Sequence, residues 1–197
     1  PHKKTILFAA QPLDSQTNST GDARAVQVKI INELIEYVIE NQVQLIIRTP
    51  PSNDSILDNH IIERAETSAS IRIDSAECYI CPAEETVHHC DVITSINSTM
   101  LLEGLIFGKT SISTNYFNFD SQFKKLGVYI VHQQKELYSQ LDDALKGESE
   151  SNTSKRLDNI AKISQFYCGG YLDGNSATRI SNYISSFHKA SWLKENT

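Results

Sequence analysis

The sequence has few of the features that mark membrane, secreted or nucleic-acid-binding proteins. Its four cysteines are too few for a disulfide scaffold in 197 residues. No apolar run approaches the length that spans a bilayer, and the first residues, PHKKTILFAAQP, lack the long apolar segment of a signal peptide. The net charge of −6 argues against non-specific nucleic-acid binding, which needs a basic surface. We therefore expect a cytoplasmic globular protein that does not bind nucleic acid.

Two common catalytic signatures are also missing. The glycine-rich run and Lys-Ser/Thr pair of a P-loop do not occur. The G-x-S-x-G nucleophile elbow of many hydrolases does not occur either. Any function of the chain must therefore come from another arrangement of polar residues.

Short apolar runs alternate with segments of helical periodicity through most of the chain. This order predicts an α/β fold: a Rossmann-like three-layer domain over 1–146 with a mainly parallel sheet of about six strands. A polar stretch precedes a C-terminal helical tail, 147–197, that we expect to pack on the domain. The expected strands are 5–9, 43–48, 70–74, 91–96, 110–114 and 128–131, and the expected helices are 23–41, 55–67, 82–90, 99–107, 134–145, 155–166 and 175–187.

The most informative stretch is DVITSINSTMLLEGLIFGKTSIST, residues 91–114, in which Asn97, Ser98 and Thr99 separate a strand from a helix. In an open parallel sheet, ligands bind at the carboxyl ends of the strands. The first amides of a helix lack intrahelical partners and favour an anion. These three residues therefore suit a phosphate cradle. Ser98 suits a helix N-cap equally well, so both interpretations stand at this point.

Glu103 favours the binding interpretation. It follows Thr99 by four residues and lies on the same helix face, one turn deeper. It is too far along to complete a capping box with Ser98. A carboxylate behind a phosphate cradle can accept hydrogen bonds from sugar hydroxyls. The alternative is an ordinary solvated helix residue.

Polar residues also follow the first two strands. Gln11, Asp14 and Ser15 come directly after the first, and Arg48 ends the second, so all four are expected at the carboxyl edge. Arg48 has the geometry to pair with a phosphate bidentately. A surface salt bridge is the stronger interpretation when Arg48 is considered alone.

Three segments together resemble the capsule polysaccharide biosynthesis family, which includes bacterial Kdo transferases. They are FAAQPLDSQ (8–16), LIIRTPPSND (45–54) and the 91–114 stretch, in that order. That family has a Gln and an Asp after the first strand of its C-terminal half and a basic residue with His-Pro after the second. Later it has Asn-Ser-Thr, Leu-Glu and Gly-Lys-Pro. More broadly, residues 5–145 resemble the donor-binding half of GT-B glycosyltransferases.

The resemblance implies roles for the matching positions. Ser98 and Thr99 match the family's phosphate-binding hydroxyls, with Asn97 beside them, and Glu103 matches its helix glutamate. Gln11, Asp14 and Arg48 match the first-loop pair and the basic position. We expect Asp14 to do acid or base work and the others, with Ser15, to bind the donor.

The chain departs from the family pattern at two places. Thr49-Pro50-Pro51 stands where the family has His-Pro, and Thr110 rather than proline follows Lys109. The missing histidine bears on donor affinity and on activity as a whole.

The resemblance implies a glycosyltransferase of bacterial surface or capsular polysaccharide that uses a CMP- or UDP-linked sugar and no other cofactor. Its partners would be a glycan or glycolipid acceptor and an N-terminal acceptor-binding half that this chain lacks. Its expected place is the cytoplasm, peripheral on the inner membrane. The alternative is a non-catalytic or regulatory sugar-nucleotide-binding module.

A different alternative is a zinc site formed by Cys78, Cys81, His88 and Cys90, whose residue types and compact spacing are those of zinc ligands. A structural site usually takes its second ligand pair from a more distant segment. Cys90 also suits a small core residue. We therefore expect no metal.

Overall fold

The computed structural model describes residues 3–12, 23–51, 57–146, 152–167 and 169–195. A six-stranded sheet of order β3-β2-β1-β4-β5-β6 forms its centre, and every neighbouring pair is parallel. This confirms the predicted Rossmann-like α/β fold. The strands are β1 (Thr5–Ala9), β2 (Gln44–Arg48), β3 (Ile71–Asp74), β4 (Val92–Ser95), β5 (Thr110–Thr114) and β6 (Tyr129–Val131).

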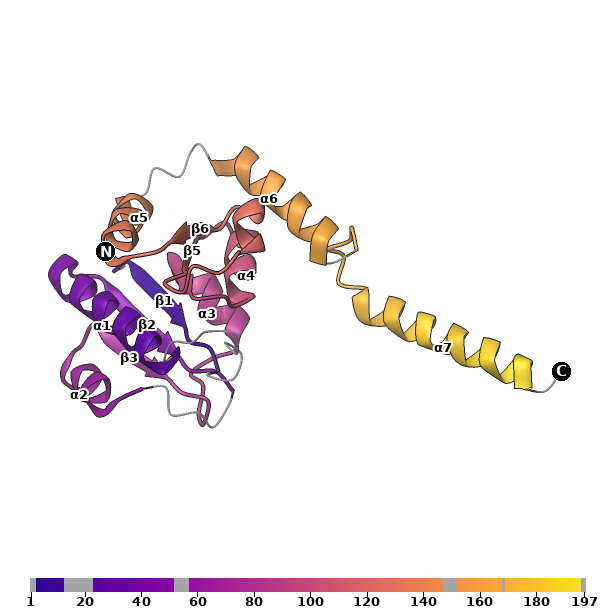
Figure 1. Cartoon of the computed structure of the whole chain (residues 1–197), viewed down its shortest axis with the longest axis horizontal. Helices are drawn as coiled ribbons and strands as arrows, with labels where there is room; N and C mark the ends of the chain where they lie inside the picture. Colours follow the sequence, from indigo (N-terminus) through magenta and orange to yellow (C-terminus); the bar gives the residue numbers. More distant parts are fainter. Residues whose placement is uncertain (1–2, 13–22, 52–56, 147–151, 168, 196–197) are drawn as a thin grey trace. The chain divides into compact units, whose positions relative to one another are not determined.

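Helices cover both faces of the sheet. Figure 1 shows α1, α2 and α5 on one side of it and α3 and α4 on the other. In agreement with this, α1 contacts α5, and α3 contacts α4. Their bounds are α1 (Ala23–Asn41), α2 (Asn59–Thr67), α3 (Ala83–His89), α4 (Met100–Ile106) and α5 (Gln134–Lys146), and a 3-10 turn, η2 (Gln122–Leu126), precedes β6.

The central strand β1 is buried on both faces, as expected of a strand covered by helices on both sides. Its Ile6 and Phe8 belong to the main core, together with a stripe of apolar residues from α1. Because α1 is amphipathic, this stripe faces the sheet and most of its polar positions face outward. Gln27 and Glu33 are polar residues of α1 that are buried. On the other face α4 packs closely, since a Cβ at Gly104 would lie 2.6 Å from Ser111 Oγ.

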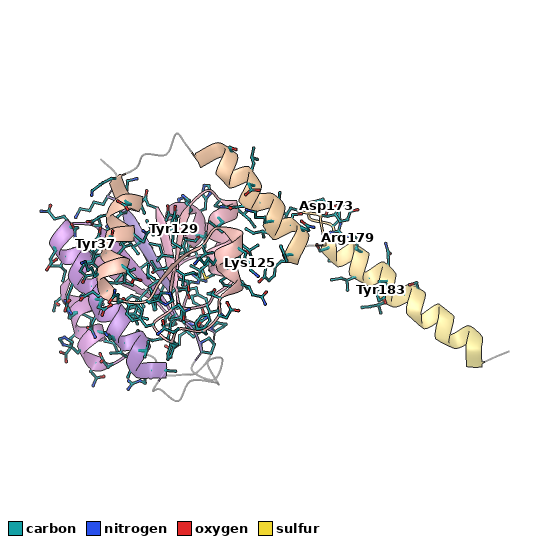
Figure 2. The ribbon with its side chains drawn as sticks, turned by 45° about the horizontal axis from the view of Figure 1, so that its top comes forward. Tyr37, Lys125, Tyr129, Asp173, Arg179 and Tyr183 are labelled. Carbon is teal, nitrogen blue, oxygen red and sulfur yellow. The ribbon has the colours of Figure 1, made fainter. Side chains whose placement is uncertain are left out.

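Polar contacts connect α1 with α5 and with the segment after β5. The Tyr37 hydroxyl, labelled in Figure 2, donates to Asp142 Oδ1 at 2.7 Å. Two further hydroxyls meet Glu33: Tyr116 donates to its carboxylate at 2.7 Å and Tyr138 to its carbonyl at 2.8 Å. These bonds give the buried polar groups partners within the helix layer.

Element boundaries differ from the sequence prediction by four residues or fewer, except that the last helix extends to Glu195, eight residues beyond its predicted end. The helix expected from residue 55 begins at Asn59, because the Asp58 carboxylate caps it by accepting from the Ile61 amide at 2.9 Å. The η2 turn was not predicted. It ends at Gly127, whose φ of 103° is in the region that favours glycine.

The chain forms two compact units, Pro1–Asn159 and Ile160–Thr197. Two helices follow the sheet in sequence, α6 (Asn152–Tyr167) and α7 (Ser176–Glu195). In the second unit, Arg179 pairs with Asp173 at 2.8 Å (Figure 2). Within the described residues, no helix has the length and apolar character needed to cross a membrane. The predicted division into 1–146 and 147–197 stays a prediction.

Candidate functional site

The candidate site lies at the carboxyl edge of the sheet, where the strand order changes direction. β2 and β4 flank β1. After β1 the chain continues to β2 on one side, and after β4 it continues to β5 on the other side. A crevice at such a switch point is where ligands bind in open α/β sheets. Gln11 follows β1, and Asn97, Ser98 and Thr99 follow β4. The structure thus brings the two predicted loops to neighbouring strand ends.

The backbone at Gln11, just after β1, is held by a residue that the sequence pattern did not single out. Gln27 of α1 is fully buried, and its side chain pairs with the backbone of Gln11 in both directions. Its Oε1 accepts from the Gln11 amide and its Nε2 donates to the Gln11 carbonyl, each at 2.9 Å. The first residues after β1 therefore have a fixed backbone. Asp14 and Ser15 lie outside the described residues.

Buried hydroxyls hold the strand ends on the other side of the crevice. Ser95 donates to the Ala9 carbonyl and Ser113 to the Ile96 carbonyl, each at 2.6 Å. Both serines are fully buried, so each hydroxyl replaces its lost water with a backbone acceptor. These bonds attach the end of β4 to β1 and to β5, just before the Asn97–Thr99 turn.

The turn itself opens α4. Ser98 Oγ accepts from the Met100 amide at 3.2 Å, so its hydroxyl supports the start of the helix. Thr99 occupies the N-cap position with helical backbone angles and makes no capping bond through its side chain. Asn97 and Thr99 are exposed and Ser98 is half-buried. The capping interpretation of Ser98 thus has a geometric basis, and the neighbouring side chains face solvent at the sheet edge.

Glu103 lies in the first turn of α4, half-buried. Burial raises the pKa of its carboxyl above the ordinary value, and the charge of Glu84 in the first turn of α3 raises it further. The two carboxylates therefore come from adjacent helix starts at the same sheet edge. Hydrogen bonds from a ligand's hydroxyl groups would stabilise the ionised form of Glu103.

The Arg48 side chain is buried and bonded to other residues of the protein. It is 7% exposed, and its Nη1 forms an ion pair with Asp74, which is 1% exposed. The same nitrogen donates to the Cys81 carbonyl at 3.0 Å and to Thr86 Oγ1 at 3.1 Å. The guanidinium lies over the Tyr79 ring, 3.9 Å from its centroid. Arg48 therefore forms a salt bridge, but a buried one rather than the surface salt bridge that the sequence favoured.

These contacts fasten the segment between β3 and α3 over the end of β2. The Ile80 amide donates to Asp74 Oδ1 at 2.8 Å, and the Tyr79 hydroxyl donates to the Thr49 carbonyl at 2.8 Å. Thr49 Oγ1 accepts from the Ala76 amide at 2.9 Å. The position where the family pattern has histidine therefore holds this segment in place.

Within the part of the chain that the structure describes, the cysteines and histidines proposed as zinc ligands are not grouped to hold a metal ion. Cys90 is 1% exposed, and burial raises the pKa of its thiol to about 12. Cys81 Sγ lies 3.1 Å from Thr86 Oγ1, and the Cys78 side chain is exposed. Among the described residues, no group of three or more His, Cys, Asp or Glu side chains is placed to hold a metal ion.

No protein-family model matches the sequence, and no curated protein matches it either. Solved structures do match. The chain is similar to UDP-GlcNAc 2-epimerase from Neisseria meningitidis bound to UDP-GlcNAc, with a TM-score of 0.62 and 12% identity over 93% of this chain and 45% of that one.

Two further solved structures match a similar share of this chain. The S. aureus MnaA–UDP structure matches with a TM-score of 0.59 and 14% identity, covering 95% of this chain and 46% of that one. The wall teichoic acid polymerase TagF matches with a TM-score of 0.56 and 13% identity, covering 96% of this chain and 44% of that one. The chain thus spans less than half the length of each. At these identities the likeness shows the fold alone, that of a Rossmann-like α/β domain.

Proposed function

We propose that the chain is the nucleotide-sugar-binding part of a glycosyltransferase that builds bacterial surface polysaccharide. The observation that carries the proposal is the pair of neighbouring strand ends of β1 and β4 at the switch point, with Ser98 and Thr99 at the start of α4. Structures of the same fold support it, since the epimerase was solved with UDP-GlcNAc, MnaA with UDP and TagF with CDPG. A capsular polysaccharide product follows from the family resemblance alone.

In this proposal the donor's phosphates lie against the Asn97–Thr99 turn. The hydroxyls of Ser98 and Thr99 donate hydrogen bonds to phosphate oxygens, and Glu103 accepts from ribose or sugar hydroxyls. Such a site accelerates transfer by stabilising the charge that develops on the departing nucleotide, so fixed donors matter more than a nucleophile. The buried Gln27 side chain contributes by fixing the backbone at Gln11 through two hydrogen bonds.

The remaining assignments rest on the sequence. Asp14 is the proposed acid or base and Ser15 a further donor-binding residue. Arg48 is a positioning residue in this proposal, because Asp74 and the Tyr79 ring already engage its guanidinium. The acceptor is a glycan or glycolipid held by a second half, and the enzyme works in the cytoplasm, peripheral on the inner membrane. The nucleotide sugar is CMP- or UDP-linked, with no other cofactor.

A specific observation favours a second candidate, a binding module without turnover. Thr49 stands at the family's histidine position and holds the Ala76 amide, and the neighbouring Arg48 is buried in an ion pair. Both positions that the family pattern places after the second strand therefore serve the fold here. Binding of the nucleotide together with no release of nucleotide from a CMP- or UDP-sugar would identify this module.

The experiment is calorimetric titration of the full chain with CMP and UDP. Ser98→Ala with Thr99→Ala should weaken binding by roughly 1.5–3 kcal/mol for each charged hydrogen bond lost. The matched control is Thr67→Ala with Ser68→Ala, because Ser68 Oγ likewise accepts from an amide two residues on, that of Ser70, at 3.2 Å. If neither nucleotide binds, or if the two double variants bind equally, the proposed cradle is wrong.

A further inference from the structure

A second hollow lies away from the switch point, along the outer edge of the sheet. It has a volume of about 490 Å³, within the range of ligand pockets. β6 and α5 form it, and β5 separates β6 from β4, so the hollow is not part of the crevice between β1 and β4. Its polar lining comes from Tyr129, Gln133, Lys135, Glu136, Ser139 and Gln140.

The lining combines one aromatic ring with side chains that hydrogen-bond in several directions. Tyr129, labelled in Figure 2, is 40% exposed. Gln133 and Gln140 each carry a donor and an acceptor on one planar group, and Lys135 adds a cation. A pyranose ring needs this combination, because its C–H face packs on an aromatic ring while its hydroxyls at the rim pair with planar polar groups.

Part of this polar lining is held in place before any ligand arrives. Glu136 Oε2 accepts from the His132 amide at 2.8 Å, and Glu136 Oε1 accepts from Gln133 Nε2 at 3.0 Å. These hydrogen bonds hold the pKa of Glu136 below its usual value, because they stabilise the ionised carboxylate. A fixed acceptor loses less entropy on binding than a mobile one.

We propose that the β6–α5 hollow is a glycan-binding site, separate from the proposed donor site, with Tyr129 as the stacking platform. An oligosaccharide fits the observations better than a peptide strand added to β6. This edge strand has only three residues, too few to fix a strand register, and its flank is a polar hollow rather than a flat edge. The proposal does not depend on the nucleotide site and can hold if that site fails.

The test is an NMR titration of the 15N-labelled full chain with two probes, chitotriose and maltotriose. At least one sugar should produce saturable shifts confined to backbone amides of residues 129–140. Tyr129→Ala should weaken binding at least about tenfold, and Tyr129→Phe should keep it within about twofold, because the ring rather than the hydroxyl makes the stacking contact. Tyr183→Ala is the control, since Tyr183 is 69% exposed on α7.

Three results would overturn the proposal. They are an absence of saturable shifts with both sugars, shifts confined to the loops after β1 and β4, and equal affinity of Tyr129→Ala and the unaltered chain. The amide spectrum of Tyr129→Ala outside residues 129–140 should match that of the unaltered chain. That match separates a lost contact from a lost fold.

Discussion

Breaking the buried Arg48–Asp74 pair should destabilise the protein strongly. Both side chains are almost fully inaccessible, and both do more than meet each other. Arg48 also donates to the Cys81 carbonyl and Thr86 Oγ1, and Asp74 also accepts from the Ile80 amide. Removing either partner leaves the other charge buried without its counter-ion.

The magnitude follows from this burial. Stranding one member of a buried ion pair typically costs about 3–5 kcal/mol, a large part of the roughly 5–15 kcal/mol that stabilises a domain. Arg48→Met and Asp74→Asn should each lower the free energy of unfolding by that amount. The double variant removes both charges, so its loss should be smaller than the sum of the single losses.

Urea unfolding followed by circular dichroism measures these differences. Arg72→Met is the matched control, because Arg72 is on the neighbouring strand β3 but exposed, and it should change stability by less than about 0.5 kcal/mol. Equal losses in Arg48→Met and Arg72→Met would refute the reasoning. So would a double variant whose loss equals the sum of its single losses.

Two further predictions concern packing and pH. Gly104→Ala should destabilise the protein by about 1–3 kcal/mol in the same unfolding assay, since its Cβ would approach Ser111 Oγ to 2.6 Å and Ile93 Cγ1 to 2.8 Å. Adding Ser111→Ala should restore part of the lost stability, and no recovery would contradict this packing account. Burial raises the pKa of Glu33, with Tyr116 opposing, so its stabilising contribution is present at acid pH and lost as pH rises through the folded-state pKa. Measured by urea unfolding at several pH values, Glu33→Gln should reduce this pH-dependent loss of unfolding free energy. Glu40→Gln, at an exposed position of α1, should leave the pH dependence unchanged.

The sequence predicted the fold well, because hydrophobic periodicity is a local signal. TILFA and QLIIR are strands because each contains a short run of contiguous apolar residues, and the strand–helix alternation then favours parallel pairing. The η2 turn was not predicted, because its five residues, QFKKL, include two adjacent lysines and have no such periodicity. Boundaries shifted where a cap such as Asp58 decided them.

The candidate site was less accessible to prediction, because its supporting contacts join distant positions. The sequence placed Ser98 and Thr99 at a helix start, which is a local property. It did not indicate Gln27, whose partner Gln11 lies 16 residues away, or Asp74, which lies 26 residues from Arg48. A strand-ending arginine next to a strand-ending aspartate is a usable signal, but only once the order β3-β2-β1 is known.

The long-range contacts share one consequence for the site. Gln27 fixes the chain after β1, Ser95 and Ser113 fix the end of β4, and Arg48 fixes the segment after β3. All of these groups are buried, so none needs to touch a ligand in order to affect binding. A preorganised site loses less entropy when it binds a ligand. The buried polar residues therefore explain how exposed Asn97 and Thr99 can form a defined surface at the N-terminal end of the short helix α4.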